Sequence, residues 1–219
     1  PDPGFAGRRQ YGGIQNKPRQ TADSSEDTQI RQRGGAVEAG KPVLLLLHGY
    51  GSNEQDLPSL VNYLPGNLPW YSLRAPLVLQ PGSYAWAHRA VPGNPQPETV
   101  EDGTSDLWAW IDANLPENCP LIALGFSQGG LMVTQLLRTR PDRILGSAII
   151  AGFTLNAPQP ADDQLLRELP AVIYCRGLDD QVISEDAVAR TLEWLENHTT
   201  AAVKTYYRLG HSIDERVMD

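Results

Sequence analysis

Short apolar runs alternate with stretches of helical spacing from residue 41 onward. The apolar runs have the length of strands and lie at 43–47, 71–74, 121–125, 146–150, 172–175 and 203–207. Apolar residues three or four positions apart mark helices at 104–114, 128–140, 163–169 and 184–197. Strands that are apolar almost throughout need cover on both faces, which helices between parallel strands provide. The pattern therefore predicts an α/β protein with a mostly parallel central sheet flanked by helices.

Residues 1–40 differ from this pattern. Apolar positions are sparse there and are separated by Gly, Gln and paired Arg residues, with neither a strand nor a helix period. We expect a flexible extension, with the alternative that it packs on a partner or adds an edge strand to the sheet. Residues 41–219 then form one folded domain, in which the Pro- and Gly-containing residues 91–97 make a surface loop.

Composition and charge exclude several classes of protein. With 41% hydrophobic and 20% charged residues the chain can bury a core, which excludes a wholly disordered, collagen-like or coiled-coil protein. The 18 basic and 26 acidic residues give a formal charge of −8, which argues against binding to nucleic acid or to anionic membranes. A small-molecule partner remains compatible with this charge.

The cysteines and the longest apolar run bear on location. Cys119 and Cys175 are too few for a disulfide framework and lack the spacing of a zinc site, so we expect two reduced thiols and no metal. The run at 43–47 is far shorter than the roughly 20 residues that span a bilayer, so no integral membrane contact is expected. The start of the chain holds no apolar signal core, which favours a cytoplasmic protein.

The strongest chemical signal is GFSQG at 125–129, which matches the pattern G-x-S-x-G. It lies directly after an apolar strand and directly before a helix. In that context the motif places a serine on a sharp turn, with its hydroxyl exposed beside the free N–H groups of the helix start. Ser127 is therefore predicted to be a nucleophile. The alternative is that the glycines only permit close packing of the helix on the strand.

A serine nucleophile needs a histidine base and a carboxylate that orients the base. His211 follows the last predicted strand, in a loop that can face the turn of Ser127. Two adjacent aspartates, Asp179 and Asp180, follow the strand at 172–175, and only one of two consecutive side chains can point at the histidine. The order Ser, Asp, His along the chain is that of α/β-hydrolases.

Acyl transfer also needs two hydrogen-bond donors for the negatively charged oxygen of the tetrahedral intermediate. The backbone N–H that follows the nucleophile belongs to Gln128, which is the first candidate. The second is Tyr50, in the segment HGYGS at 48–52, which follows the strand at 43–47 and whose glycines permit close approach of the backbone. We interpret His48 in this segment as a structural residue.

Several segments together resemble the carboxylesterase/phospholipase family, which includes the acyl-protein thioesterases. They are HGYGSNEQDL at 48–57, GFSQGG at 125–130, GLDDQVI at 177–183 and LGHSI at 209–213. The resemblance spans about 41–213 and implies that residues 41–219 form an α/β-hydrolase catalytic domain.

The resemblance also implies a role for each matching residue. The family's acid motif is similar to G-x-x-D-x-V, which counted from Gly177 selects Asp180 over Asp179. Ser127 and His211 then correspond to nucleophile and base. Tyr50 and Gln128 correspond to the two oxyanion donors.

The spacing of the strands limits the cover over the site. Only 21 residues, 151–171, separate two consecutive strands, which is too few for a large cap domain. An open groove favours esters of small to medium acyl chains. The side chains expected to border it are Leu57, Trp86, Phe153, Leu155 and Val182. Trp86 belongs to a segment that resembles the family's aromatic stretch near the acyl pocket, and it could equally be a core residue.

We therefore expect a carboxylesterase of EC class 3.1.1 that needs no cofactor and cleaves small-molecule esters through an acyl-enzyme. An acyl thioesterase or lysophospholipase would use the same triad, and a binding module that has lost turnover is the alternative from another class. A homodimer stays open. Because 8 residues follow His211, we expect a closing helix shorter than is usual for the family.

Overall fold

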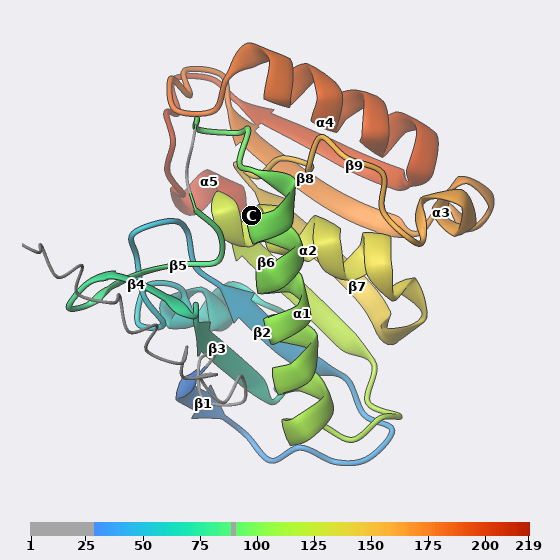
Figure 1. Cartoon of the computed structure of the whole chain (residues 1–219). Helices are drawn as coiled ribbons and strands as arrows, with labels where there is room; N and C mark the ends of the chain where they lie inside the picture. Colours follow the sequence, from blue (N-terminus) through green and yellow to red (C-terminus); the bar gives the residue numbers. More distant parts are fainter. Residues whose placement is uncertain (1–28, 89–90) are drawn as a thin grey trace, which may run out of the picture.

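A computed structural model describes residues 29–88 and 91–219 (Figure 1). Its strands are β1 (Gln29–Gly34), β2 (Val43–Leu47), β3 (Trp70–Arg74), β4 (Leu77–Gln80), β5 (Ser83–Ala85), β6 (Leu121–Phe126), β7 (Ile144–Ile150), β8 (Ala171–Gly177) and β9 (Thr200–Tyr206). This part of the chain contains a seven-stranded sheet in the order β1-β3-β2-β6-β7-β8-β9 and a separate β4–β5 hairpin. Neighbouring strands of the sheet are parallel, except that β1 runs antiparallel to β3. The predicted α/β fold with a mostly parallel sheet is confirmed.

Helices cover both faces of the sheet. They are α1 (Pro97–Asn114), α2 (Gln128–Thr139), α3 (Asp162–Glu168), α4 (Glu185–His198) and α5 (Glu215–Met218), with 3₁₀ turns η1 (Pro58–Tyr63) and η2 (Pro141–Arg143). Figure 1 shows α1 and α2 in front of the sheet, and apolar side chains of α1 to α4 share one core cluster with the strands. Residues of η1 and α5 pack in a second cluster on the opposite face.

The central strand β2 shows why the fold needs both layers. All five of its residues are buried, because the side chains alternate between the two faces and each face is covered. Leu45 and Leu47 contribute to the cluster under α1 and α2, whereas Leu44 and Leu46 contribute to the cluster under η1 and α5. The near-continuous apolar strands of the sequence thus correspond to a sheet that is buried on both sides.

Each predicted strand and helix is present, and the largest difference in bounds is at α1. This helix begins at Pro97, seven residues before the predicted start at 104. Proline suits the first position of a helix because its missing N–H has no partner there and its φ is already helical. The Pro-containing segment that predicts a loop therefore also contains a helix start.

Part of the region predicted as an extension pairs with the sheet. Residues 1–28 lie outside the described residues, so the prediction of a flexible segment there stays a prediction. Residues 29–34 form the edge strand β1, which pairs with β3. An edge strand was the alternative for this region, and the polar composition of QIRQRG explains why no apolar pattern indicated it.

Two findings concern the thiols and the bilayer. Cys119 and Cys175 are both buried and neither forms a disulfide. Among the helices in 29–88 and 91–219, none combines the length and the apolar composition that crossing a membrane requires.

The carboxyl ends of the parallel strands lie at one edge of the sheet. There, β2 has β3 on one side and β6 on the other, although β6 is much later in the chain. The loops that follow β2 and β6 therefore diverge at this edge and leave a crevice, which is where α/β proteins bind their ligands.

We predict that the two-sided burial of β2 dominates stability. Substituting Leu45 (0% exposed) by alanine leaves a cavity and should lower the free energy of unfolding by about 2–5 kcal/mol. The matched variant Leu145→Ala, at a 59% exposed leucine of β7, should change it by about 0.5 kcal/mol or less. Urea unfolding followed by circular dichroism measures both. Equal losses in the two variants would contradict the assignment of the core.

Candidate active site

Ser127 lies in the sharp turn that joins β6 to α2. Its φ of 56° and ψ of −117° are outside the regions that residues with a side chain ordinarily occupy. The turn is held by hydrogen bonds from the backbone N–H of Ser127 to the carbonyl of Ile150 (2.9 Å) and from the N–H of Leu131 to the carbonyl of Ser127 (3.1 Å). Ser127 occupies the N-cap position of α2, yet its hydroxyl makes no capping bond. That hydroxyl therefore points to other partners.

Two positions of the GFSQG segment have no room for a side chain and therefore require glycine. A Cβ on Gly129 would overlap the carbonyl oxygen of Leu47 at the end of β2, and a Cβ on Gly125 would overlap the carbonyl oxygen of Gly129. The start of α2 thus lies in backbone contact with β2 and β6. This contact brings the loop after β2 next to the serine turn.

The structure brings Ser127, His211 and Asp180 together from three separate loops. Nε2 of His211 is 2.8 Å from Oγ of Ser127, and Nδ1 of His211 is 2.7 Å from Oδ2 of Asp180. An ionised carboxylate only accepts hydrogen bonds, so Nδ1 carries the proton and Nε2 is left to accept the serine proton. This geometry can raise the nucleophilicity of the serine hydroxyl.

The environment of Asp180 favours its ionised form. Burial disfavours the charge, but the hydrogen bonds from His211 and from the backbone N–H groups of Val182 and Ile183 outweigh it, so the pKa of Asp180 lies below its ordinary value. Its side chain is 4% exposed. The carboxylate is therefore held in place by three donors.

The neighbouring Asp179 has a different position. It is exposed, and its backbone N–H donates to the carbonyl of Leu209 (2.9 Å), which ties the loop after β8 to the loop after β9. Consecutive side chains point in different directions, so only Asp180 reaches the imidazole.

A chain of hydrogen bonds joins the segment after β2 to the start of α2. The side-chain oxygen of Gln128 accepts from the backbone N–H of Trp86 (2.8 Å), and its side-chain nitrogen donates to the carbonyl of Ala87 (2.9 Å). The indole N–H of Trp86 in turn donates to the carbonyl of His48 (2.9 Å). Tyr50 and Gln128, whose backbones are the candidate oxyanion donors, thus belong to segments that Trp86 links.

His48 is fixed in one neutral tautomer. Its Nε2 accepts from the backbone N–H of Ala75 (3.1 Å), so Nδ1 carries the proton and donates to the carbonyl of Gly49 (2.8 Å). Burial lowers the pKa of His48. Both ring nitrogens of His48 are thus engaged with the backbone of neighbouring segments, as suits the structural role predicted from the sequence.

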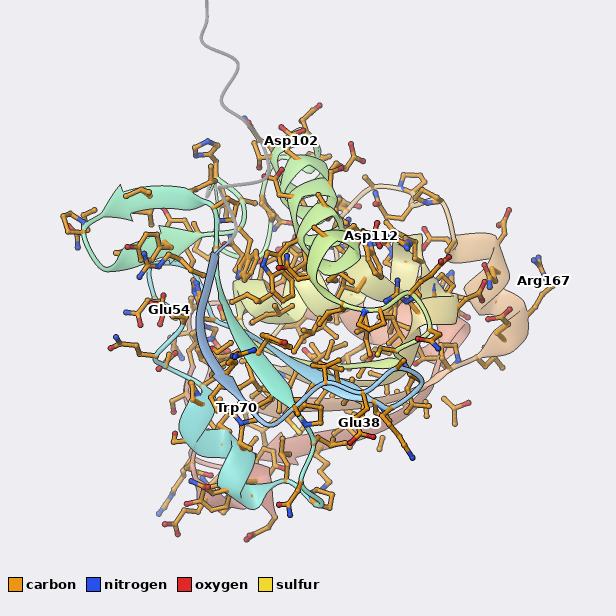
Figure 2. The ribbon with its side chains drawn as sticks, turned by 90° about the horizontal axis from the view of Figure 1, so that it is seen from below. Glu38, Glu54, Trp70, Asp102, Asp112 and Arg167 are labelled. Carbon is orange, nitrogen blue, oxygen red and sulfur yellow. The ribbon has the colours of Figure 1, made fainter. Side chains whose placement is uncertain are left out.

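An ion pair holds the next part of the same loop. Glu54, which is 3% exposed, accepts two hydrogen bonds from Arg74 at the end of β3, at 2.9 and 2.7 Å. The guanidinium of Arg74 also lies 4.3 Å from the centre of the ring of Tyr84, in the β4–β5 hairpin. Figure 2 shows Glu54 beside this hairpin. The backbone of Ser52 bridges to Tyr84 as well. The hairpin and β3 therefore brace the segment that contains Tyr50.

Two hollows meet at His211. The smaller, of about 220 Å³, contains Ser127 and is lined by Tyr50, Val91, Pro92, Gly93, Pro95, Gln128, Phe153, Val182, Ile183 and His211. The larger, of about 560 Å³, lies between η1 and α5 and contains His211, Phe126 and Leu57 but not the serine. The ring of Phe126 packs against the imidazole, with 5.0 Å between ring centres. The imidazole thus separates the two spaces.

The sequence matches the phospholipase/carboxylesterase family over residues 35–219. The chain belongs to this family. The resemblance noted in the sequence is therefore confirmed. None of the curated proteins matches the sequence.

Solved structures with the same fold include two bacterial carboxylesterases and a plant protein. The Bacillus cereus carboxylesterase has a TM-score of 0.69 at 23% identity, with 85% of this chain and 88% of that chain covered. The Mesorhizobium loti carboxylesterase has a TM-score of 0.68 at 19% identity, with 83% and 86% covered. Arabidopsis thaliana SOBER1 has a TM-score of 0.64 at 21% identity, with 81% and 94% covered. These similarities support the α/β-hydrolase fold for this family member.

The predicted groove residues are divided among different places. Phe153 and Val182 line the hollow that contains Ser127, and Leu57 lines the larger hollow on the other side of His211. Trp86 is fully buried in the main core, where its indole N–H donates to the carbonyl of His48 and so has a partner. Leu155 is 2% exposed, packs in one cluster with Phe153 and Ile183, and is absent from the lining of the hollow that contains Ser127. Trp86 and Leu155 are therefore core residues and do not border the groove.

Sequence reasoning missed one wall of the smaller hollow. Val91, Pro92, Gly93 and Pro95 line it, together with Ile183. The proline and glycine content of 91–97 does indicate a turn-rich segment, but nothing in it indicates which face of the domain it covers.

We predict that the backbone contact at the start of α2 tolerates no side chain. In the variant Gly129→Ala the added methyl group must displace β2 or α2, so the free energy of unfolding should fall by about 1–3 kcal/mol or more. The control is Gly146→Ala in β7, where a Cβ would meet only side-chain atoms of Ile122 at 3.8 Å or more. Thermal unfolding of the two variants is the measurement. A Gly129→Ala protein as stable as Gly146→Ala would refute the close approach.

Proposed function

We propose that this family member is a serine carboxylesterase that cleaves small-molecule esters through an acyl-enzyme, without a cofactor. The observation that carries the proposal is the hydrogen-bonded series Ser127, His211, Asp180, with distances of 2.8 and 2.7 Å. It lies at a strained turn and opens into a hollow large enough for a small acyl group. This combination is what acyl transfer by a serine requires.

In the first step, Oγ of Ser127 bonds to the carbonyl carbon of the ester while Nε2 of His211 takes the hydroxyl proton. Asp180 stabilises the imidazolium that forms and keeps Nδ1–H directed away from the serine. The carbon–oxygen bond to the alcohol then breaks, and Nε2 gives its proton to the leaving oxygen. In the second step, water adds to the acyl-enzyme by the same proton route and releases the carboxylic acid.

The negative charge of the tetrahedral intermediate falls on the former carbonyl oxygen. Gln128 is the first residue of α2, and the first N–H groups of a helix have no acceptor within the helix. Its N–H is our first oxyanion donor. The backbone N–H of Tyr50, which lines the same hollow, is the second.

Each of the two hollows then takes one part of the ester. The acyl group occupies the space that contains Ser127 and both proposed donors, and the alcohol leaves through the larger space beyond His211, which supplies its proton. The volume of about 220 Å³ lies below the roughly 300–1,000 Å³ of pockets for drug-sized ligands. This volume supports a preference for esters of small to medium acyl chains.

The first experiment compares the protein with Ser127→Ala. We expect the parent protein to hydrolyse p-nitrophenyl acetate and butyrate and to be labelled by a fluorophosphonate. In the variant, kcat for the esters should fall by about 10⁴-fold or more and the labelling should be lost. Ser105→Ala, on an exposed serine of α1, is the control and should keep full activity. Hydrolysis that persists in Ser127→Ala would exclude the proposed nucleophile, and an inactive parent protein would exclude the function. Rates on matched oxygen and sulfur esters separate an esterase from a thioesterase.

The adjacent aspartates provide a matched pair of variants. Asp180→Asn should lower kcat by about 10²–10⁴-fold, because an amide can stabilise the tautomer of His211 that lacks an acceptor for the serine proton. Asp179→Asn should stay within a few-fold of the parent, since its side chain is exposed. Because the pKa of Asp180 is held below its ordinary value of 3.8, the carboxylate of the parent protein is ionised from pH 5 to 8, so the parent should lose no activity through protonation of Asp180 in this range. A larger loss in Asp179→Asn would reverse the assignment.

A further inference from the structure

Arg190 of α4 lies behind the smaller hollow and contacts two of its walls. Its Nη1 donates to Oδ1 of Asn94 (2.8 Å), and its Nη2 donates to the carbonyl of Gly93 (2.8 Å). Its Nε and Nη2 also donate to the carbonyl of Thr154, at 3.1 and 2.8 Å. Gly93 lines the hollow and Thr154 directly follows Phe153, which lines it too. One guanidinium thus connects two segments that are far apart in the sequence.

The wall that contains Gly93 is fastened to the start of α4 by further contacts. Gly93 has a φ of 89°, and a Cβ on it would be 2.8 Å from Cβ of Ala187 and 3.2 Å from Oγ of Ser184. The side-chain nitrogen of Asn94 donates to Oγ of Ser184 (3.2 Å) and to Oδ2 of Asp186 (3.0 Å). The loop therefore lies directly on the first turn of α4.

The second wall lies on the same helix. Besides the bonds from Arg190, the backbone N–H of Thr154 donates to Oγ1 of Thr191 (3.0 Å), which itself donates to the carbonyl of Ala187 (2.7 Å). Both walls of the hollow are thus attached to α4.

The bonds of Arg190 are made mainly with neutral oxygens. Its nearest carboxylate in the described part of the chain is that of the exposed Asp186, at 3.7 Å, whereas Arg138 donates twice to Asp162, at 2.8 and 2.9 Å. A planar guanidinium can bind several acceptors at fixed angles, which a lysine ammonium cannot do. The guanidinium of Arg190 therefore acts as a rigid spacer between backbone segments.

We propose that Arg190 is a positioning residue that sets the length of acyl chain this enzyme accepts, by holding the 91–95 loop against the segment that contains Phe153. Arg190 is not among the residues that line the hollow, so it acts through the two walls and touches no substrate. The inference rests on the proposed function. Loss of the guanidinium should let the loop move outward and admit longer chains.

The test measures kcat/KM for p-nitrophenyl acetate, butyrate and octanoate, which share one leaving group and differ only in the acyl chain. In Arg190→Met, which keeps the length of the side chain but has no donor, the ratio of octanoate to acetate should rise by about tenfold or more. Arg190→Lys should give an intermediate ratio. Arg140→Met is the matched control: Arg140 bonds to Asp112 and lies over Trp108, remote from both walls, so the ratio should stay that of the parent.

Each outcome decides the inference. A folded Arg190→Met protein with an unchanged ratio, or with an equal loss for all three esters, would overturn it while leaving the proposed function intact. If Arg190→Met does not fold, the same ratio of kcat/KM for octanoate to acetate is measured for Asn94→Ala, which removes the acceptor of Nη1 and should also raise the ratio. If the parent protein hydrolyses none of the esters, the proposed function falls and this inference falls with it.

Discussion

The close approach of two backbones is the constraint on which the rest of this structure depends. Gly129, in the first turn of α2, lies so near the carbonyl of Leu47 that no side chain fits between the helix and β2. This contact forces the chain to turn sharply at Ser127 and places the loop after β2 beside the start of the helix. Without it, the serine would take an ordinary N-cap conformation, and its hydroxyl would be available to the helix and not to His211.

Rigidity around the serine comes from side chains that form hydrogen bonds with the backbone of neighbouring loops. Gln128, Trp86 and His48 form one series of hydrogen bonds, and Glu54 with Arg74 fixes the next stretch of the same loop. Each of these groups has a backbone or ionic partner, so hydrogen bonds of defined direction hold the loop in addition to its burial. Arg190 plays the equivalent part on the opposite side of the hollow.

The sequence predicts the fold and the positions of Ser127 and His211 from local signals, whereas the preference for Asp180 over Asp179 depends on the family resemblance. Apolar strands, a glycine-flanked serine and a histidine after the last strand each have a pattern that can be recognised without coordinates. The substrate walls depend on long-range packing. Trp86 lies in the core, where its indole donates to the carbonyl of His48, and Gly93 lines the hollow, where its carbonyl accepts from Arg190. Neither long-range contact has a local signature in the sequence. An edge strand in the region of β1 was only the alternative prediction for a related reason, since an edge strand needs no apolar run.

The burial of the His48 imidazole also makes the free energy of unfolding depend on pH. In the unfolded chain the imidazole is protonated when the pH is below its ordinary pKa of 6.5. In the folded protein its pKa is lower than this, because burial disfavours the charge. As the pH falls below 6.5, unfolding therefore becomes coupled to proton uptake, and the free energy of unfolding decreases by up to about 1.4 kcal/mol per pH unit until the folded-state pKa is reached. The loop that carries Tyr50 is built around this residue, so acid acts on the stability of the domain through the same histidine that gives the loop its shape.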